Sequence, residues 1–251
     1  MDWLAAAAKL DDDRLGGEWT WTENPRGETL QVRDALYALL ENELDAAARV
    51  RHDTYASAQM AMAQAAFGDL RGLLAGSASQ LLDSTPAEGE WTIRQTLKHM
   101  LEVELSYRSH IEWAVTRKDS EPVRRPDSMA PKPDETVLEG NVAAVLDRLA
   151  AARARTDSSL SDIKEEMFGR PSIWVGHDVD VAFRLRRFAS HISEHTIQVE
   201  KALDSLSVRL GEARRIARRM SAARGLHERK TSAERLGELD RRAAARISSL
   251  A

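Results

Sequence analysis

The chain has 251 residues and a formal net charge of −4 at pH 7, with 43% hydrophobic and 30% charged residues. This composition excludes a disordered chain, and the slight acidity excludes a general attraction to nucleic acid or anionic lipid. The chain has no cysteine, so disulfides, a cysteine nucleophile and a zinc–thiolate site are all excluded.

The first residues do not resemble a targeting segment, because they lack a basic region and Asp11 to Asp13 interrupt their apolar run. No stretch of the sequence approaches the roughly 20 apolar residues that a membrane-spanning helix needs. We therefore expect a cytoplasmic protein without a membrane span. The many alanines and leucines, with few aromatics, prolines and glycines, favour an all-α fold.

Apolar residues at helical spacing predict a first helix over residues 30–50 and a second over 55–82. Pro86 and Gly89 then mark a turn. A third helix is expected to run to about residue 115. Its start at Thr92, followed three residues later by Gln95, matches the capping-box pattern.

Four prolines and many charged residues in segment 117–133 predict a long crossover loop. Two further helices are expected over 135–159 and 179–203, and the second of these is strongly amphipathic. Four core helices with one long connection fit a helix bundle, which we place at residues 54–206. Residues 1–53 would then form an N-terminal helical extension.

The tail, residues 207–251, carries twelve Arg or Lys against five Asp or Glu. It is interpreted as a basic helical hairpin with Gly225 near its turn. Because aromatic residues do not alternate with the basic ones and the rest of the chain is acidic, nucleic acid is not an expected partner. Its basic ridge is formed by Arg214, Arg215, Arg218 and Arg219. We expect this ridge to be solvated, or paired with the acidic remainder of the chain or with a second subunit.

Three histidines are the candidate metal ligands. His191 and His195 are four residues apart on a predicted helix, so their side chains lie one turn apart on the same face. His99 lies in the other strongly amphipathic helix, where an antiparallel neighbour can bring it opposite this pair. Three neutral nitrogen ligands with an open fourth position are typical of a catalytic zinc site.

The segment from His191 to His195 also matches the H-x-x-E-H pattern of inverted zincin peptidases. The peptidase interpretation is disfavoured, because the following residues form a basic helical tail and the preceding ones lack a mixed sheet. Glu194 is therefore not counted among the expected site residues.

Three short motifs, in this order, resemble the DinB-like superfamily: Trp91–Gln95, Leu97–Glu104 and Arg187–His195. The resemblance covers about residues 55–203. That superfamily includes mycothiol-dependent and bacillithiol-dependent transferases. The resemblance implies an up-down-down-up four-helix bundle with its crossover in segment 117–133, and commonly a homodimer. It also implies metal binding by His99, His191 and His195.

Further candidates follow from their spacing to these histidines. Arg187 lies four residues before His191 and is a candidate to hold an anionic substrate or the carboxylate of a thiol. Glu102 and Glu104 follow His99 by three and five residues, and either is a candidate to orient an imidazole or to act as a base.

The sequence and the resemblance together predict a metal-dependent S-transferase that acts on a small molecule and uses a mycothiol-like, low-molecular-weight thiol as cosubstrate. Zinc is the expected divalent metal, and nickel or iron would also suit three imidazoles. Two alternatives use the same ligands. One is a metal-dependent hydrolase, and the other is a non-catalytic, metal-binding or stress-associated dimer.

Overall fold

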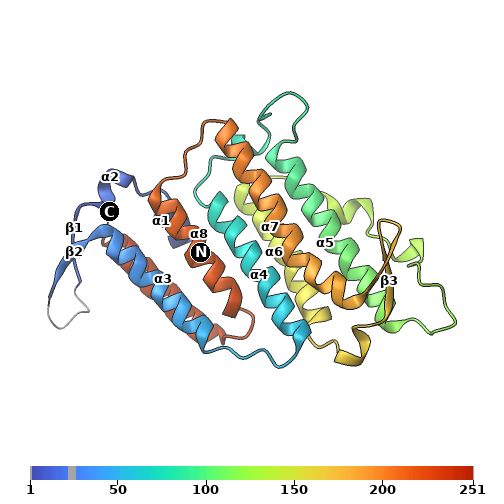
Figure 1. Ribbon diagram of the computed structural model, residues 1–251. Helices are drawn as coiled ribbons and strands as arrows, with labels where there is room; N and C mark the ends of the chain where they lie inside the picture. The colour runs from blue at the N-terminus through green and yellow to red at the C-terminus, as the bar shows by residue number, and fades with distance from the viewer. Residues whose placement is uncertain (1, 22–26, 251) are drawn as a thin grey trace. The chain divides into compact units, whose positions relative to one another are not determined.

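The computed structural model describes residues 2–21 and 27–250 (Figure 1). The predicted extension and tail also include residues 1, 22–26 and 251, which lie outside this description. The chain divides into two compact units, which we name the terminal unit and the bundle unit. The terminal unit comprises Met1–Arg51, Ala65–Ser77 and Val208–Ala251, and the bundle unit comprises His52–Gln64 and Ala78–Ser207. The described residues are mostly helical, as predicted.

Three long helices make up most of the bundle unit: α5 (Ile93–Thr116), α6 (Val142–Leu160) and α7 (Val181–Ser205). Helix α5 packs alongside both α6 and α7 (Figure 1). The apolar face of α7, which includes Leu185 and Phe188, is buried as its periodicity predicted. This packing places residues of α5 and α7 that are far apart in the sequence in a common seam.

The first turns of α4 (Tyr55–Leu74) also belong to the bundle unit. The hydroxyl group of Thr54, just before α4, donates a hydrogen bond to the carbonyl oxygen of Ser161 at 2.8 Å. Further along α4, the sulfur of Met60 lies 3.8 Å from a guanidinium nitrogen of Arg153 on α6. These contacts fix the start of α4 against the end and the middle of α6.

The starts of α5 and α7 follow from local sequence. Thr92 caps α5 by accepting a hydrogen bond from the backbone N–H of Gln95, and the Gln95 side chain accepts one from the backbone N–H of Thr92. The predicted capping box is thereby confirmed. Asp180 caps α7 by accepting a hydrogen bond from the backbone N–H of Phe183 at 2.6 Å. Both helices that carry the candidate ligands therefore begin at defined residues.

Two predicted helix limits are wrong. Helix α4 ends at Leu74, where the sequence predicted a helix to residue 82, because Gly76 adopts a left-handed conformation with φ of 69°. Residues after it form a short 3₁₀ helix, η1 (Ser79–Leu82). Helix α6 begins at Val142, seven residues later than predicted, because Asn141 caps it and Gly140 before it has φ of 89°.

The crossover segment has no long helix, as predicted, but it contains the 3₁₀ helix η2 (Asp127–Met129). Two more short 3₁₀ helices flank α6: η3 (Pro133–Thr136) before it and η4 (Glu165–Met167) after it. Of these short elements, only η3 overlaps the helix that the sequence predicted over 135–159.

A β-hairpin, which the sequence analysis did not predict, precedes α7. Strands β3 (Pro171–Trp174) and β4 (His177–Asp180) pair antiparallel, with Trp174 opposite His177. Val175 and Gly176 form the two-residue turn, with φ of 49° and 81°. Positive φ at both central positions is the geometry of the tight hairpin turns that match the twist of paired strands.

The terminal unit contains elements from both ends of the chain. Its N-terminal part contains α1 (Asp2–Ala8), α2 (Asp12–Leu15), the paired strands β1 (Glu18–Thr20) and β2 (Thr29–Gln31), and α3 (Val32–Ala48). Its C-terminal part contains α8 (Glu212–His227) and α9 (Ala233–Ser248).

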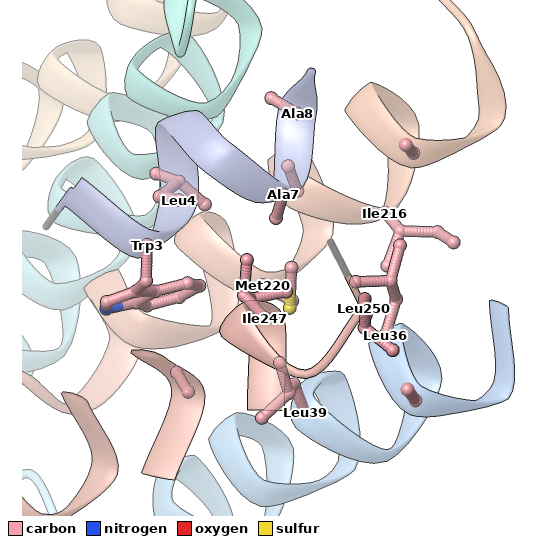
Figure 2. Packing of buried hydrophobic residues seen from close by; sticks show 14 of the residues in the cluster. Trp3, Leu4, Ala7, Ala8, Leu36, Leu39, Ile216, Met220, Ile247 and Leu250 are labelled. Carbon is pink, nitrogen blue, oxygen red and sulfur yellow. The ribbon is translucent and has the colours of Figure 1, made fainter. Parts of the chain in front are cut away.

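Helix α3 packs against α8, and α1 packs against α8 and α9. Figure 2 shows apolar side chains of α1, α3, α8 and α9 meeting in one buried cluster. The N-terminal extension and the basic tail therefore share a hydrophobic core.

Glycine on α4 allows close packing inside the terminal unit. A Cβ atom at Gly68 would lie 2.2 Å from the carbonyl oxygen of Ser221, and one at Gly72 would lie 2.5 Å from the Cα atom of Arg218. Both positions face the backbone of α8, which cannot move away as easily as a side chain. The glycines are required for this approach of α8 to the second half of α4.

The tail forms two helices, as predicted, and Gly225 lies buried in the last turn of α8, near the connection to α9. The chain turns after Glu228, and Ser232 then caps α9. Part of the basic charge of the tail is paired within the terminal unit. Arg218 contacts Asp69 at 2.9 Å, and the buried Arg224 contacts the buried Glu43 and also Asp240. Among the described helices, none combines the length and apolar character needed to cross a membrane.

Candidate metal centre

The packing of α5 against α7 brings the three predicted ligands together. His191 and His195 lie one turn apart on α7 and are both buried. His99 projects from α5 and is partly exposed. The ring centroid of His99 lies 5.3 Å from that of His191 and 4.8 Å from that of His195. The predicted convergence of these three histidines is confirmed by their positions.

The imidazole nitrogens are spaced as ligands of one ion. The Nε2 atom of His191 lies 3.4 Å from that of His99 and 2.9 Å from that of His195. One ligand atom from each histidine can be chosen such that all three lie within 4.8 Å of one another. Nitrogens bound tetrahedrally to zinc at about 2.0–2.1 Å are separated by about 3.3 Å. The residues therefore fit a divalent metal held by three neutral imidazoles.

The hydrogen bond of His195 favours the tautomer that a metal needs. Its Nδ1 atom lies 2.7 Å from Oε1 of Gln198, an acceptor one turn further along α7. With Nδ1–H donating to this oxygen, the lone pair of Nε2 points toward the other two histidines. Gln198 was not predicted from the sequence, although its position three residues after a candidate ligand is the spacing that permits such a contact.

Burial favours the neutral form of two of the three histidines, His191 and His99. Desolvation lowers the pKa of His191 to about 3, and the neighbouring His195 and His99 lower it further if they carry charge. Desolvation also lowers the pKa of His99, to which the charge of His195 again contributes. Neutral imidazole is the form that binds a metal, so both histidines are ready to act as ligands at neutral pH.

Aromatic rings surround the cluster. The indole of Trp91 meets the His99 ring edge-on at 5.4 Å, and the ring of Tyr107 lies 5.8 Å from that of His191. Tyr107 also packs edge-on against Phe188 at 5.6 Å. Sequence reasoning did not single out Tyr107. Its position about two turns after His99 on α5 was the available signal.

Arg187 lies one turn before His191 on α7, and its charge acts to lower the pKa of that histidine. One of its terminal nitrogens donates to the hydroxyl of Ser190 at 3.1 Å, and the other lies 3.6 Å from a carboxylate oxygen of Glu194. Its guanidinium group also lies over the ring of Trp174, 5.3 Å from the ring centroid. The unpredicted β3–β4 hairpin therefore contributes to positioning Arg187.

The two candidate glutamates occupy different environments. Glu102 is partly exposed, lies 3.8 Å from the amine of Lys98, and its charge acts to raise the pKa of His99. Glu104 is buried, and its carboxylate accepts a hydrogen bond of 2.6 Å from the guanidinium group of the equally buried Arg153. Glu102 is thus near the cluster and accessible, whereas the carboxylate of Glu104 is held by α6. His177, exposed in β4, is not part of the histidine cluster.

A comparison with protein-family models gave a match to this chain. A model described as the DinB superfamily matches residues 62–199, more than half of the 251 residues, and this range contains all three histidines. Neither curated proteins nor solved structures gave a match. The matched range lies within the segment for which the sequence motifs indicated a resemblance.

Proposed function

Because the chain belongs to the DinB superfamily, we propose that it is a metal-dependent S-transferase that uses a low-molecular-weight thiol. The observation that supports this proposal is the convergence of three imidazole nitrogens in a chain that has no cysteine of its own. The thiol nucleophile would then come from a cosubstrate such as mycothiol or a related compound. The electrophilic substrate would be a small molecule.

His99, His191 and His195 would hold the metal, for which zinc is our first choice and nickel or iron fits the same ligand set. When bound, such an ion supplies positive charge that favours the thiolate form of the cosubstrate. The hydrogen bond from His195 to Gln198 would hold that ligand in the metal-binding tautomer. The rings of Trp91 and Tyr107 would exclude water from two sides of the cluster.

Arg187 and Glu102 are the side chains that we assign to the reaction itself. The guanidinium group of Arg187 would bind an anionic group of the substrate or the thiol, because it lies near His191 and carries its charge beside the cluster. Glu102 would accept a proton, since it is accessible and close to His99. For Glu104, whose carboxylate is engaged by Arg153, we propose a role in positioning α5. We further propose that the protein is a homodimer and that it acts in the cytoplasm.

Metal content tests the ligand assignment. We expect the wild-type protein, purified without a polyhistidine tag, to hold one equivalent of metal by elemental analysis, and His191→Ala to hold much less. His177→Ala is the matched control, because His177 is exposed and outside the cluster. Equal metal content in His191→Ala and His177→Ala would contradict the assignment.

A thiol panel tests the reaction. Metal-loaded protein would be assayed with mycothiol, bacillithiol, glutathione or coenzyme A and a generic electrophile such as a bimane halide. We expect conjugation above the uncatalysed rate with at least one thiol, and its loss after metal removal and in Arg187→Gln. A metal-loaded protein that conjugates none of them would contradict the transferase proposal and favour the non-catalytic, metal-binding alternative.

A further inference from the structure

Two arginines of the bundle unit, Arg125 and Arg184, both contact α5: Arg125 at Ser109 and Arg184 at Tyr107. Arg184 is on the first turn of α7, and only 2% of its surface is exposed. Arg125 belongs to the crossover segment before η2 and is partly exposed. The two charges are close enough that Arg125 acts to lower the pKa of Arg184. Two positive charges in a poorly solvated region are unfavourable unless a negative charge compensates them.

The hydrogen-bond partners of Arg184 are neutral. Its Nε–H donates to the hydroxyl of Ser172 at 2.7 Å, and one terminal nitrogen donates to the carbonyl oxygen of Ile173. The guanidinium group also lies over the ring of Tyr107, 5.6 Å from its centroid. These contacts fix the β3–β4 hairpin to the bundle but leave the positive charge uncompensated.

The partners of Arg125 are also neutral, and they use only one end of its guanidinium group. The Nη1 atom donates to the hydroxyl of Ser109 and to the carbonyl oxygen of Met129. The Nε atom is buried and has no hydrogen-bond acceptor among the residues that the structure describes. The edge formed by Nε and Nη2 is the edge with which arginine binds two oxygens of a carboxylate or phosphate.

No carboxylate in the described ranges 2–21 and 27–250 forms an ion pair with either arginine. Asp127 is near enough to favour the charged form of Arg125, but burial has the larger effect and lowers its pKa. Burial also lowers the pKa of Arg184 to about 10. The adjacent His110 is neutral at pH 7, since burial and both arginines lower its pKa to about 4. The region therefore keeps an excess of positive charge.

We propose that Arg125, which Ser109 holds in place, and Arg184 form a binding site for an oxyanion, which would be the carboxylate or phosphate group of a small molecule. Buried charges in proteins are normally paired, and an oxyanion on the Nε–Nη2 edge of Arg125 would supply the missing negative charge. The two arginines lie beside the metal centre, with Tyr107 in contact with both Arg184 and His191, but they are not among its ligands. Arg184 precedes His191 by seven residues, which is about 10 Å along a helix.

Isothermal titration calorimetry on the full chain tests this site. Inorganic phosphate, sulfate and acetate would be titrated separately, with chloride keeping the ionic strength constant. We expect saturable binding of at least one anion, and the preferred anion distinguishes a phosphate from a carboxylate ligand. Arg125→Gln should weaken binding about 10- to 100-fold, because charge-assisted hydrogen bonds are lost. Arg124→Gln is the control, since it removes the same charge from an exposed neighbour.

The proposal is overturned if no anion binds saturably, if Arg125→Gln binds as tightly as the wild type, or if Arg124→Gln loses as much affinity as Arg125→Gln. Circular dichroism would show whether each variant folds. If Arg125→Gln does not fold, Arg125→Lys replaces it. Lysine keeps the charge but lacks the two-nitrogen edge, so we expect about tenfold weaker binding. Anion binding should be unchanged in His191→Ala, which separates this test from the fate of the metal proposal.

Discussion

Replacing Gln198 by alanine removes the acceptor that orients one of the three ligands. In the structure, Nδ1 of His195 and Oε1 of Gln198 are 2.7 Å apart. Without this acceptor the ring of His195 can rotate, and its proton can move to Nε2, where it would block metal binding. The substitution should therefore weaken metal binding while leaving all three imidazoles in place.

The size of the effect follows from the exposure of Gln198. Loss of a partner that orients a ligand typically costs 10- to 100-fold in metal affinity. Gln198 is exposed, so water can accept the proton of Nδ1 in its place. We therefore expect the lower end of this range, about tenfold, or about 1.4 kcal/mol. Gln198→Glu should bind metal at least as tightly as the wild type, because a carboxylate is a stronger acceptor.

Competition with a chromophoric chelator at pH 7.5 measures these affinities. Ser193→Ala, an exposed position on the same helix, is the matched control and should bind metal like the wild type. An unchanged metal affinity in Gln198→Ala would refute the argument that this hydrogen bond sets the tautomer of His195. An equal loss in Ser193→Ala would instead indicate a general effect on α7.

Three further predictions concern stability. Glu104→Gln leaves the buried Arg153 without the negative charge that compensates it. We therefore expect the free energy of unfolding in urea to fall by about 3–5 kcal/mol, and an unchanged unfolding midpoint would contradict this. Gly68→Ala places a Cβ atom 2.2 Å from a backbone oxygen of α8 and should lower the unfolding free energy by about 1–3 kcal/mol. Gly169→Ala, which meets nothing within 4 Å, should change the thermal midpoint much less. Because burial lowers the pKa of His110 to about 4, the unfolded chain binds more protons between about pH 4 and 6.5. Stability should fall as the pH drops through this window, by on the order of 1 kcal/mol at pH 5 after allowance for partial exposure. His110→Gln should remove this part of the pH dependence, and an identical dependence in both proteins would contradict the assignment.

Some features of the candidate site were predictable because they are local. The four-residue spacing of His191 and His195 places both side chains on one helix face, whatever the rest of the fold does. The capping box at Thr92 likewise depends on residues within one turn. His99 required more than spacing. Its position opposite the pair depends on how α5 packs against α7, and the sequence indicated this only through the resemblance to a family.

Other features were not predictable, because they depend on contacts between distant segments or on unusual backbone. The β3–β4 hairpin turns at Val175, a β-branched residue in a left-handed conformation that sequence rules assign to glycine or asparagine. This hairpin brings Trp174 to Arg187. Likewise, nothing local to Arg125 or Arg184 shows that both lack a carboxylate partner within the described structure.

Local sequence and tertiary packing therefore each account for part of the three-histidine cluster. The sequence by itself determined the helices, the capped start of α5 and the pairing of His191 with His195, because helical periodicity and capping act over a few residues. Tertiary structure decided which groups surround the cluster, from the hydrogen bond to Gln198 to the engagement of Glu104 by Arg153. It also decided that α1 and α3 share a core with α8 and α9, elements about 200 residues apart. Such contacts arise when apolar faces are buried together, and periodicity shows that a face is apolar without showing which face will cover it.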